Sequence, residues 1–202
     1  DVAESARDAL TGLPNHRAFH EALEREHTNA EKQGHPLALV MFDVDELSLI
    51  NERHGHKVGD DVITEVARRI SAILRSEDLL ARTGGEEFAC VFPSTDGQAG
   101  WRAAERARRA VEDAPFDIVG EVTVSAGICD LATAGSAQEL IRLAEGALYW
   151  SKIHGRNVVY RYTPEFMDVL SAEDRAVQAE RSRTLSAITA LARAVDAKDG
   201  NT

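Results

Sequence analysis

The chain has 202 residues, of which 44% are hydrophobic and 28% charged, and its formal net charge is −11. This length favours one domain with a substantial appendage, and the hydrophobic fraction is ordinary for a packed core. The acidic balance argues against a protein that binds nucleic-acid polymers through a basic surface, but it does not exclude a single nucleotide held through metal ions. Because no apolar stretch is long enough to span a membrane and no signal peptide is visible, we expect no membrane contact from this segment and a cytoplasmic location.

Cysteine and histidine give no sign of a disulfide framework or a metal site. Cys90 and Cys129 both lie in apolar, strand-like runs, so we expect buried free thiols and a reducing compartment. His54 and His56 have no matching ligand set nearby and are expected on the surface or in a loop. The charged, helical start of the chain and its end at residues 198–202 indicate a piece of a longer protein.

In chain order, the apolar periodicity predicts helix, strand, helix, helix, strand, strand, helix, strand, helix, strand. The first helix is expected over residues 17–32 with Asn15 as its N-cap, and the clearest strand over residues 36–45. That strand is apolar on both faces and should be central and covered. A short helix over residues 46–53 is followed by a break at two glycines, and a second helix is expected to start near Asp60.

From residue 79 onward the pattern predicts a hairpin of residues 79–81 and 88–92, followed by a helix over 97–113. A strand or strand pair over 116–129, a helix capped by Ser136 and an edge strand over 158–160 are expected after it. This order indicates an α/β sandwich of the ferredoxin-like kind, with a mixed sheet, a central hairpin and helices on one side. Residues 164–202 change character and are expected to form a helical extension with a narrow apolar stripe.

The predicted hairpin carries the most unusual sequence of the chain. Gly84 and Gly85 lie between two apolar runs, which indicates a tight turn that needs positive φ, and their missing Cβ atoms let another molecule approach the backbone. Glu86 and Glu87 follow directly. Consecutive carboxylates at a hairpin tip need solvent or a cation to neutralise them, so a solvated acidic turn and a cation site both fit these residues.

A second acidic pair ends the central strand. Asp43 and Asp45 should point the same way, because side chains alternate along a strand. Two like charges at the end of a buried strand repel unless something positive lies between them. The pattern favours a metal site over a simple cap or turn.

Three further pairs each allow a structural and a functional interpretation. Asn51 and Asp60 could cap two helices or pair with a guanine edge, since Asn both donates and accepts while Asp only accepts. Lys152 and Arg156 could complement a helix dipole or hold phosphates.

Arg75 and Asp78, three residues apart near a helix end, could form a local ion pair of small value. They could also grip a ligand that offers both a guanine and a phosphate, because an Arg fork binds phosphate and a carboxylate accepts from the base.

Together, the motifs resemble those of the GGDEF family, the diguanylate cyclases, over residues 8 to about 161. Six separated motifs carry the resemblance in the family's order: DALTGLPN at residues 8–15, FDVD at 42–45, Asn51 through Gly59-Asp60, Arg75-x-x-Asp78, GGEEF at 84–88, and Lys152-x-x-x-Arg156-Asn157. The resemblance implies a nucleotidyl-cyclase-type fold over residues 1–163. It also implies a reaction in which two GTP molecules, held by two facing copies of the domain, condense to cyclic di-GMP and two pyrophosphates.

The resemblance also implies roles for individual residues. Asp43, Glu86 and the Val44 carbonyl would hold two Mg²⁺ ions (or Mn²⁺), and Glu87 would assist at the metal or at the attacking hydroxyl, which makes Asp43, Glu86 and Glu87 the catalytic candidates. The substrate-binding candidates are Gly84 and Gly85 against ribose and phosphates, Asn51 and Asp60 on the guanine, and Lys152 and Arg156 on the β- and γ-phosphates. Arg75 and Asp78 fall at the family's product-inhibition site, where cyclic di-GMP binds.

Two departures leave an alternative open. Where the family usually has Phe-Lys after the FDxDx run, this chain has Leu47-Ser48, which keeps an apolar contact but removes a cation near the phosphates. The tail from about residue 183 resembles the opening helix of an HD-GYP phosphodiesterase domain, truncated at residue 202. The alternative function is a catalytically weak or inactive module that binds GTP or cyclic di-GMP and controls a downstream phosphodiesterase.

Overall fold

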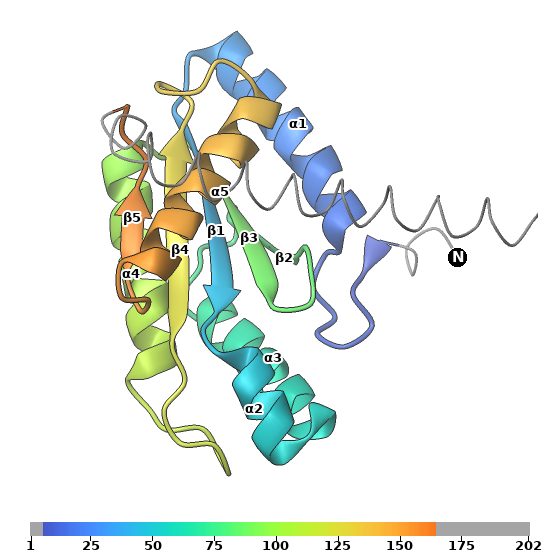
Figure 1. The fold of residues 1–202 in the computed structure, drawn as a ribbon. Helices are drawn as coiled ribbons and strands as arrows, with labels where there is room; N and C mark the ends of the chain where they lie inside the picture. Colours follow the sequence, from blue (N-terminus) through green and yellow to red (C-terminus); the bar gives the residue numbers. More distant parts are fainter. Residues whose placement is uncertain (1–5, 165–202) are drawn as a thin grey trace, which may run out of the picture. The chain divides into compact units, whose positions relative to one another are not determined.

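The structure is a computed structural model that describes residues 6–164. Its centre is one five-stranded sheet in the order β2-β3-β1-β4-β5, with β1 (Leu37–Val44) in the middle and buried at every position (Figure 1). β3 (Glu87–Pro93) and β4 (Val124–Asp130) flank β1 antiparallel, β2 (Leu79–Arg82) forms the hairpin with β3, and β5 (Val159–Arg161) runs parallel to β4 at the edge. The predicted order of elements, the mixed sheet and the central strand are confirmed.

Helices cover both faces of the sheet, so the prediction of helices on one side is wrong. α1 (His16–Gln33) and α5 (Ala137–Ile153) pack on the face that carries Leu37, Leu39 and Met41 of β1. α3 (His56–Ser71) and α4 (Gly97–Glu112) pack on the face that carries Ala38, Val40 and Phe42. Because residues 37–42 of β1 are all apolar, both of its faces must be removed from water.

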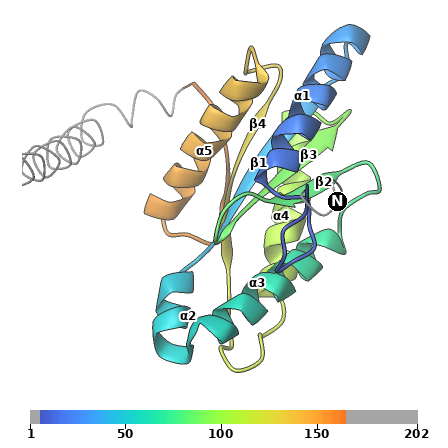
Figure 2. The same ribbon diagram turned by 90° about the vertical axis from the view of Figure 1, so that its right-hand side faces the viewer.

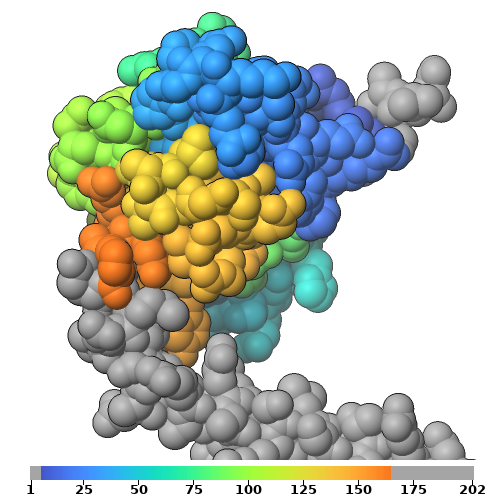
Figure 3. Space-filling model, turned by 90° about the horizontal axis from the view of Figure 1, so that it is seen from above, coloured from blue at the N-terminus to red at the C-terminus, as the bar shows by residue number. Residues whose placement is uncertain are grey.

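α1 and α5 also contact each other at one end of the molecule. Figure 3 shows the blue surface of α1 beside the yellow surface of the segment that leads into α5. At this contact Gln138 Nε2 donates to Glu24 Oε1 at 2.7 Å. Further along, α5 approaches β4 so closely that a Cβ on Gly127 would collide with the backbone of Ala144 and Leu148. Gly127 therefore sets how near to the sheet α5 runs, and α5 carries Lys152 in its last turn.

The chain turns from β1 into α2 (Leu47–His54) through Glu46, whose φ of 56° is in the left-handed region. α2 and α3 lie together at the end of the molecule where β1 stops (Figure 2). The predicted start of the second helix near Asp60 is wrong: α3 begins at His56, and only Gly55, with φ 86°, separates the two helices. Gly59 lies inside α3, where a residue with a Cβ would not fit, because that atom would collide with the side-chain oxygen of Asn51 on α2.

Other local predictions agree with the structure. The side chains of Asn15 and Ser136 cap α1 and α5 as expected, and Cys90 and Cys129 are buried free thiols. Of the predicted strand or strand pair over residues 116–129, only β4 is a strand, and Phe116 and Gly120 form an isolated bridge. No helix in residues 6–164 is long and apolar enough to cross a membrane. The predicted helical extension and HD-GYP-like start lie outside the described residues.

One arginine of α3 joins the two helices of its face to the loop after α4. The guanidinium of Arg69 donates to the backbone oxygens of Val111 and Ala114 at 2.7 and 2.6 Å and lies 3.9 Å from the ring centre of Phe116. Its Nε also donates to Glu65 Oε1 at 2.8 Å. Arg68 pairs with the same Glu65, but its side chain is 67% exposed against 10% for Arg69.

This pair of neighbours makes a direct test of burial. We expect Arg69→Ala to lower the free energy of unfolding by about 2 kcal/mol, because it leaves the partly buried Val111 carbonyl without this donor and removes a cation–π contact. Arg68→Ala should change it by less than about 0.5 kcal/mol, since an exposed ion pair is screened by water. Urea unfolding followed by circular dichroism measures both, and equal midpoints for the two variants would contradict the assignment.

Candidate active site

The end of β1 and the acidic hairpin are neighbours in the sheet. In the antiparallel register Asp43 lies directly opposite Glu87, and the backbone N–H of Val44 donates to the Glu86 carbonyl at 3.0 Å. Directly opposed side chains point to the same face of a sheet, so Asp43 and Glu87 share the face covered by α1 and α5. Such an adjacency is necessary if Asp43 and the GGEEF hairpin are to hold the same metal ions.

Lys152, in the last turn of α5, reaches the carboxylates at the end of β1. Its ammonium donates to Asp43 Oδ1, to Asp45 Oδ1 at 3.1 Å, and to the Val44 carbonyl at 3.5 Å. The positive charge that two aligned aspartates require is thus supplied by this lysine in the described structure. Asp43 and Asp45 are both buried, and Lys152 is partly buried.

Burial and mutual repulsion raise the pKa values of two carboxyl groups in this cluster. Burial, and then the charges of Glu87 and Asp45, raise the pKa of Asp43 above its usual value despite the opposing effect of Lys152. Burial and the charge of Asp43 likewise raise the pKa of Glu86. Burial alone would lower the pKa of Lys152, but its hydrogen bond to Asp43 and the nearby charge of Asp45 raise it. Asp43, Asp45 and Glu86 thus bring three carboxyl groups near a single ammonium.

Such an excess of carboxylate oxygen fits a hard divalent cation. Asp43 and Glu86 are near each other, and the Val44 carbonyl faces the same ammonium as Asp43. Among the described residues, no three Asp, Glu, His or Cys side chains already converge with metal-ligand spacing. The fit therefore rests on the donor set and its charge.

The hairpin tip differs from the predicted turn. The loop between β2 and β3 comprises residues 83–86, and neither Gly84 nor Gly85 has positive φ, so that part of the prediction is wrong. A Cβ at Gly84 would come within 2.6 Å of Glu87 Oε2, the end of an exposed side chain that could turn aside. At Gly85 nothing lies within 4 Å of such an atom, which leaves the backbone open to an approaching molecule.

Arg82, which precedes the tip, anchors it to the start of the domain. Its Nη1 donates to both carboxylate oxygens of Asp8 at 3.0 and 3.1 Å, and its Nη2 donates to the Gly85 carbonyl at 2.7 Å. The sequence reasoning assigned neither residue a role. A basic residue next to the glycines and an acid in a separate motif were the only signals for this pair.

The two guanine candidates come from neighbouring helices. Asn51 on α2 lies against Gly59 of α3, next to Asp60, so the structure brings the two candidate residues to adjoining positions. The side-chain oxygen of Asn51 is buried and has no hydrogen-bond partner within residues 6–164. Asn51 makes no capping bond at either end of α2 or α3 through its side chain, so the capping alternative is not what the structure contains.

The second phosphate candidate, Arg156, lies in the turn between α5 and β5. It is exposed, and its guanidinium makes no hydrogen bond or ion pair to the described part of the chain. The turn is held by Asp45, which accepts from the backbone N–H of Asn157 at 3.0 Å. Asp45 is therefore a structural anchor as well as a partner of Lys152, a role that its position in the acidic pair did not reveal.

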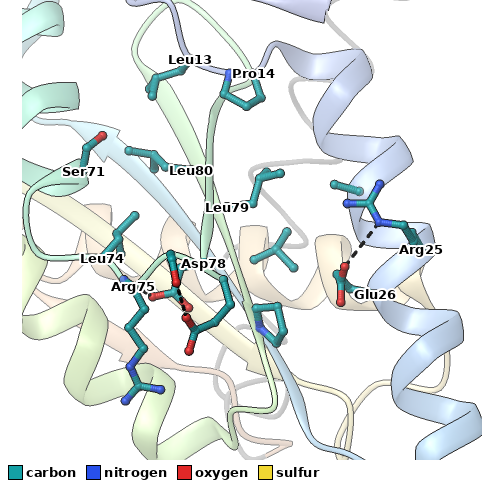
Figure 4. A pocket seen from close by; sticks show the side chains of 15 residues that line it. Leu13, Pro14, Arg25, Glu26, Ser71, Leu74, Arg75, Asp78, Leu79 and Leu80 are labelled. Carbon is teal, nitrogen blue, oxygen red and sulfur yellow. Dashed lines mark hydrogen bonds and ion pairs between the residues drawn. The ribbon is translucent and has the colours of Figure 1, made fainter.

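Arg75 and Asp78 line a separate cavity of about 460 Å³ (Figure 4). Their side chains form no ion pair in the structure. Asp78 Oδ2 instead accepts from the backbone N–H of Arg75 at 2.9 Å, and Oδ1 is buried with no partner among the described residues. Burial raises the pKa of Asp78. Arg25 of α1 lines the opposite wall, where its Nε lies 3.4 Å from Glu26 Oε1, so the cavity holds two arginines together with carboxylates, of which Asp78 is incompletely bonded.

Comparison with known proteins places these motifs in a family. The family described as "Diguanylate cyclase, GGDEF domain" matches residues 5–158. Diguanylate cyclase DgcP of Pseudomonas aeruginosa is 39% identical over 153 residues, which are 74% of this chain and 23% of that protein. Response regulator PleD of Caulobacter vibrioides is 36% identical over 158 residues, which are 75% of this chain and 35% of that protein. The chain therefore spans about a quarter to a third of the length of these relatives.

Solved structures agree in fold. The GGDEF domain of DgcB from Caulobacter crescentus, crystallised in complex with c-di-GMP, superposes with a TM-score of 0.73 at 33% identity, covering 78% of this chain and 93% of that one. The GGDEF domain of YfiN (TpbB) from Pseudomonas aeruginosa gives a TM-score of 0.78 at 30% identity, covering 82% and 99%.

The raised pKa of Glu86 makes a stability prediction. Ionising Glu86 disfavours the folded state at neutral pH, because its folded pKa lies above the unfolded value of 4.5. We expect Glu86→Gln to raise the melting temperature of the metal-free protein by about 2 °C at pH 7. The gain should disappear toward pH 4, where both states become protonated.

The matched control is Glu145→Gln on the exposed side of α5, which should leave the melting temperature unchanged at either pH. Differential scanning calorimetry in EDTA measures both variants. A lower melting temperature for Glu86→Gln at pH 7 would show that this carboxylate stabilises the metal-free fold, contrary to the prediction.

Proposed function

The chain belongs to the GGDEF family of diguanylate cyclases, and on that premise we propose that it condenses two molecules of GTP to cyclic di-GMP and two pyrophosphates. In each half of the reaction a ribose 3′-oxygen forms a bond to an α-phosphorus, and the bond from that phosphorus to the pyrophosphate oxygen breaks. The observation that carries the proposal is the carboxylate cluster at the end of β1, where Asp43 faces the GGEEF hairpin and Lys152.

Asp43, Glu86 and the Val44 carbonyl are the groups that would hold two Mg²⁺ ions, or Mn²⁺ in their place. When bound, these ions would neutralise the triphosphate and lower the pKa of the attacking hydroxyl. Glu87 lies opposite Asp43 in the register and is exposed, which supports a role next to that hydroxyl or the metal.

The chain's own part in the reaction is to bind and orient the nucleotide. Asn51, with its unpartnered oxygen, and Asp60 would pair with the guanine edge. Gly85 leaves its backbone open to ribose and phosphates. Lys152 and Arg156 would bind the β- and γ-phosphates, for which the exposed, unpaired Arg156 guanidinium is suited.

The chemistry implies two copies of the domain. Each copy would bind one GTP, so we infer that a homodimer is the active form. Because GTP is the substrate, we also infer that the reaction takes place in the cytoplasm.

We further propose that cyclic di-GMP inhibits the enzyme at the cavity lined by Arg75 and Asp78. The free oxygen of Asp78 offers an acceptor for guanine N–H groups, and Arg75 offers a fork for guanine or phosphate. Arg25 on the opposite wall is paired with Glu26, so Arg75 is the cation that we assign to the ligand.

The regulatory alternative depends on Ser48, which lies exposed at the start of α2 where the family usually has a lysine. The retained acids and the phosphate-binding cations favour the enzyme. GTP that binds but is not consumed would favour the regulatory module, and Ser48→Lys would then be the first change to make.

The proposed reaction is tested by incubating the chain with GTP and Mg²⁺ and separating the nucleotides by chromatography. We expect cyclic di-GMP and pyrophosphate from the unchanged chain and at least a 100-fold lower rate from Asp43→Asn, which removes a charge at the developing transition state. Glu145→Gln should retain the full rate. A rate for Asp43→Asn equal to that of the unchanged chain would exclude the proposed metal site.

Product inhibition makes a separate prediction. Arg75→Ala should raise the inhibition constant for cyclic di-GMP by about tenfold or more, because a charge-assisted hydrogen bond to the ligand is lost. The initial rate without product should stay the same, since the cavity is distinct from the carboxylate cluster. Arg102→Ala, an exposed arginine of α4, is the control, and unchanged inhibition in Arg75→Ala would remove the assignment.

A further inference from the structure

The turn between α5 and β5 has an unusual backbone. Gly155, Arg156 and Asn157 follow one another with φ of 104°, 59° and 48°. Residues with a side chain rarely adopt the left-handed region, although Asn tolerates it better than most. Two such residues in succession persist only where the surroundings hold them. The contacts of Asn157 show what holds this turn.

The backbone of Asn157 is fixed from the end of β1. Its N–H donates to Asp45 Oδ2 at 3.0 Å and lies 3.2 Å from Ser125 Oγ. The side chain of Asp45 is only 4% exposed and also accepts from Thr123 Oγ1 at 2.8 Å and Ser125 Oγ at 2.7 Å. These bonds leave Asp45 no freedom to turn away, so the position of the N–H of Asn157 is set by the sheet.

The side chain of Asn157 is fixed from the opposite side, by α4. Its Oδ1 accepts from Arg108 Nη1 at 2.6 Å, and its Nδ2 donates to Glu112 Oε1 at 2.7 Å. Arg108 is buried and also binds Glu112 Oε2 at 2.6 Å, so the three side chains form a closed ring of contacts. The amide of Asn157, followed by Arg108, lowers the pKa of Glu112.

We propose that Asn157 is a positioning residue for Arg156. The sheet holds its backbone and α4 holds its side chain, and between these two supports the preceding residue is kept in the left-handed conformation. The role of Arg156 in binding the terminal phosphates rests on the proposed function. Arg108 and Glu112 then affect phosphate binding only through Asn157. Both lie on α4, which supplies no other residue to the proposed site.

A purely structural role makes a different prediction. Arg108 also forms a two-point ion pair with Glu105, through Nε at 3.0 Å and Nη2 at 2.8 Å, and Glu105 makes no contact with Asn157. If the cluster only stabilises α4, the loss of Glu105 and of Glu112 should have similar effects. If Arg108, Glu112 and Asn157 together position Arg156, loss of Glu112 should weaken triphosphate binding and loss of Glu105 should not.

The test is isothermal titration of the whole chain, in Mg²⁺, with a non-hydrolysable GTP analogue and separately with GMP. Asn157→Gly keeps the left-handed backbone accessible and removes only the side-chain support. We expect it to weaken binding of the triphosphate analogue about tenfold and to change GMP binding less than twofold, because GMP lacks the β- and γ-phosphates. Glu112→Ala should act in the same direction, about threefold, and Glu105→Ala should change neither affinity.

The outcomes separate the inference from the function on which it rests. If Arg156→Ala does not weaken triphosphate binding, the phosphate role of Arg156 is wrong. If Arg156→Ala weakens it and Asn157→Gly does not, the positioning role is wrong. Equal losses for GMP and the triphosphate would also overturn it, since they would indicate a general change in the site. The double variant Arg156→Ala, Asn157→Gly should bind the triphosphate analogue no more weakly than Arg156→Ala alone. Without the Arg156 guanidinium, Asn157 has no group left to position.

Discussion

One ammonium group shared by two buried carboxylates holds the end of β1 together. Lys152 reaches Asp43 and Asp45 only because α5 runs close to the sheet, and α5 runs close because Gly127 offers no Cβ to its backbone. Removing one partner of a buried pair leaves an unpaired charge away from water, which is far costlier than losing an exposed pair. The sheet register, the helix packing and the candidate site therefore depend on the same contact.

The same contact compensates only part of the negative charge of the acidic site. Asp43 and Glu86 both have raised pKa values because burial and like charges oppose their ionisation. A bound divalent cation would lower the free-energy cost of ionising these carboxyl groups. The site would therefore bind a cation together with a triphosphate more favourably than it would if the carboxyl groups were already neutralised. Natural sites commonly keep such unfavourable charge where function needs it. Asp45 differs from Asp43 in being fully occupied by donors of the fold, so the two members of the acidic pair serve different ends.

Local signals predicted much of this molecule. The caps of α1 and α5, the apolar run of β1 and the spacing of the motifs were sufficient to assign the elements and the family, because each depends on residues close in sequence. The prediction that the glycines break the helix before Asp60 was wrong at Gly59 for a physical reason. Gly59 lies inside α3 and is required by the side chain of Asn51 on α2, and a neighbour brought in by folding is not visible in a local pattern.

The sequence by itself determined which residues we assign to the proposed chemistry, since the acids, the glycines and the two cations stand in motifs of fixed spacing. Only the tertiary structure decided what each charge faces. It paired Lys152 with Asp43 across the sheet, left Arg156 unpaired among the described residues, and tied Asn157 to α4. Electrostatic energy depends on distance in space rather than along the chain, so a motif names its charged groups but not their partners.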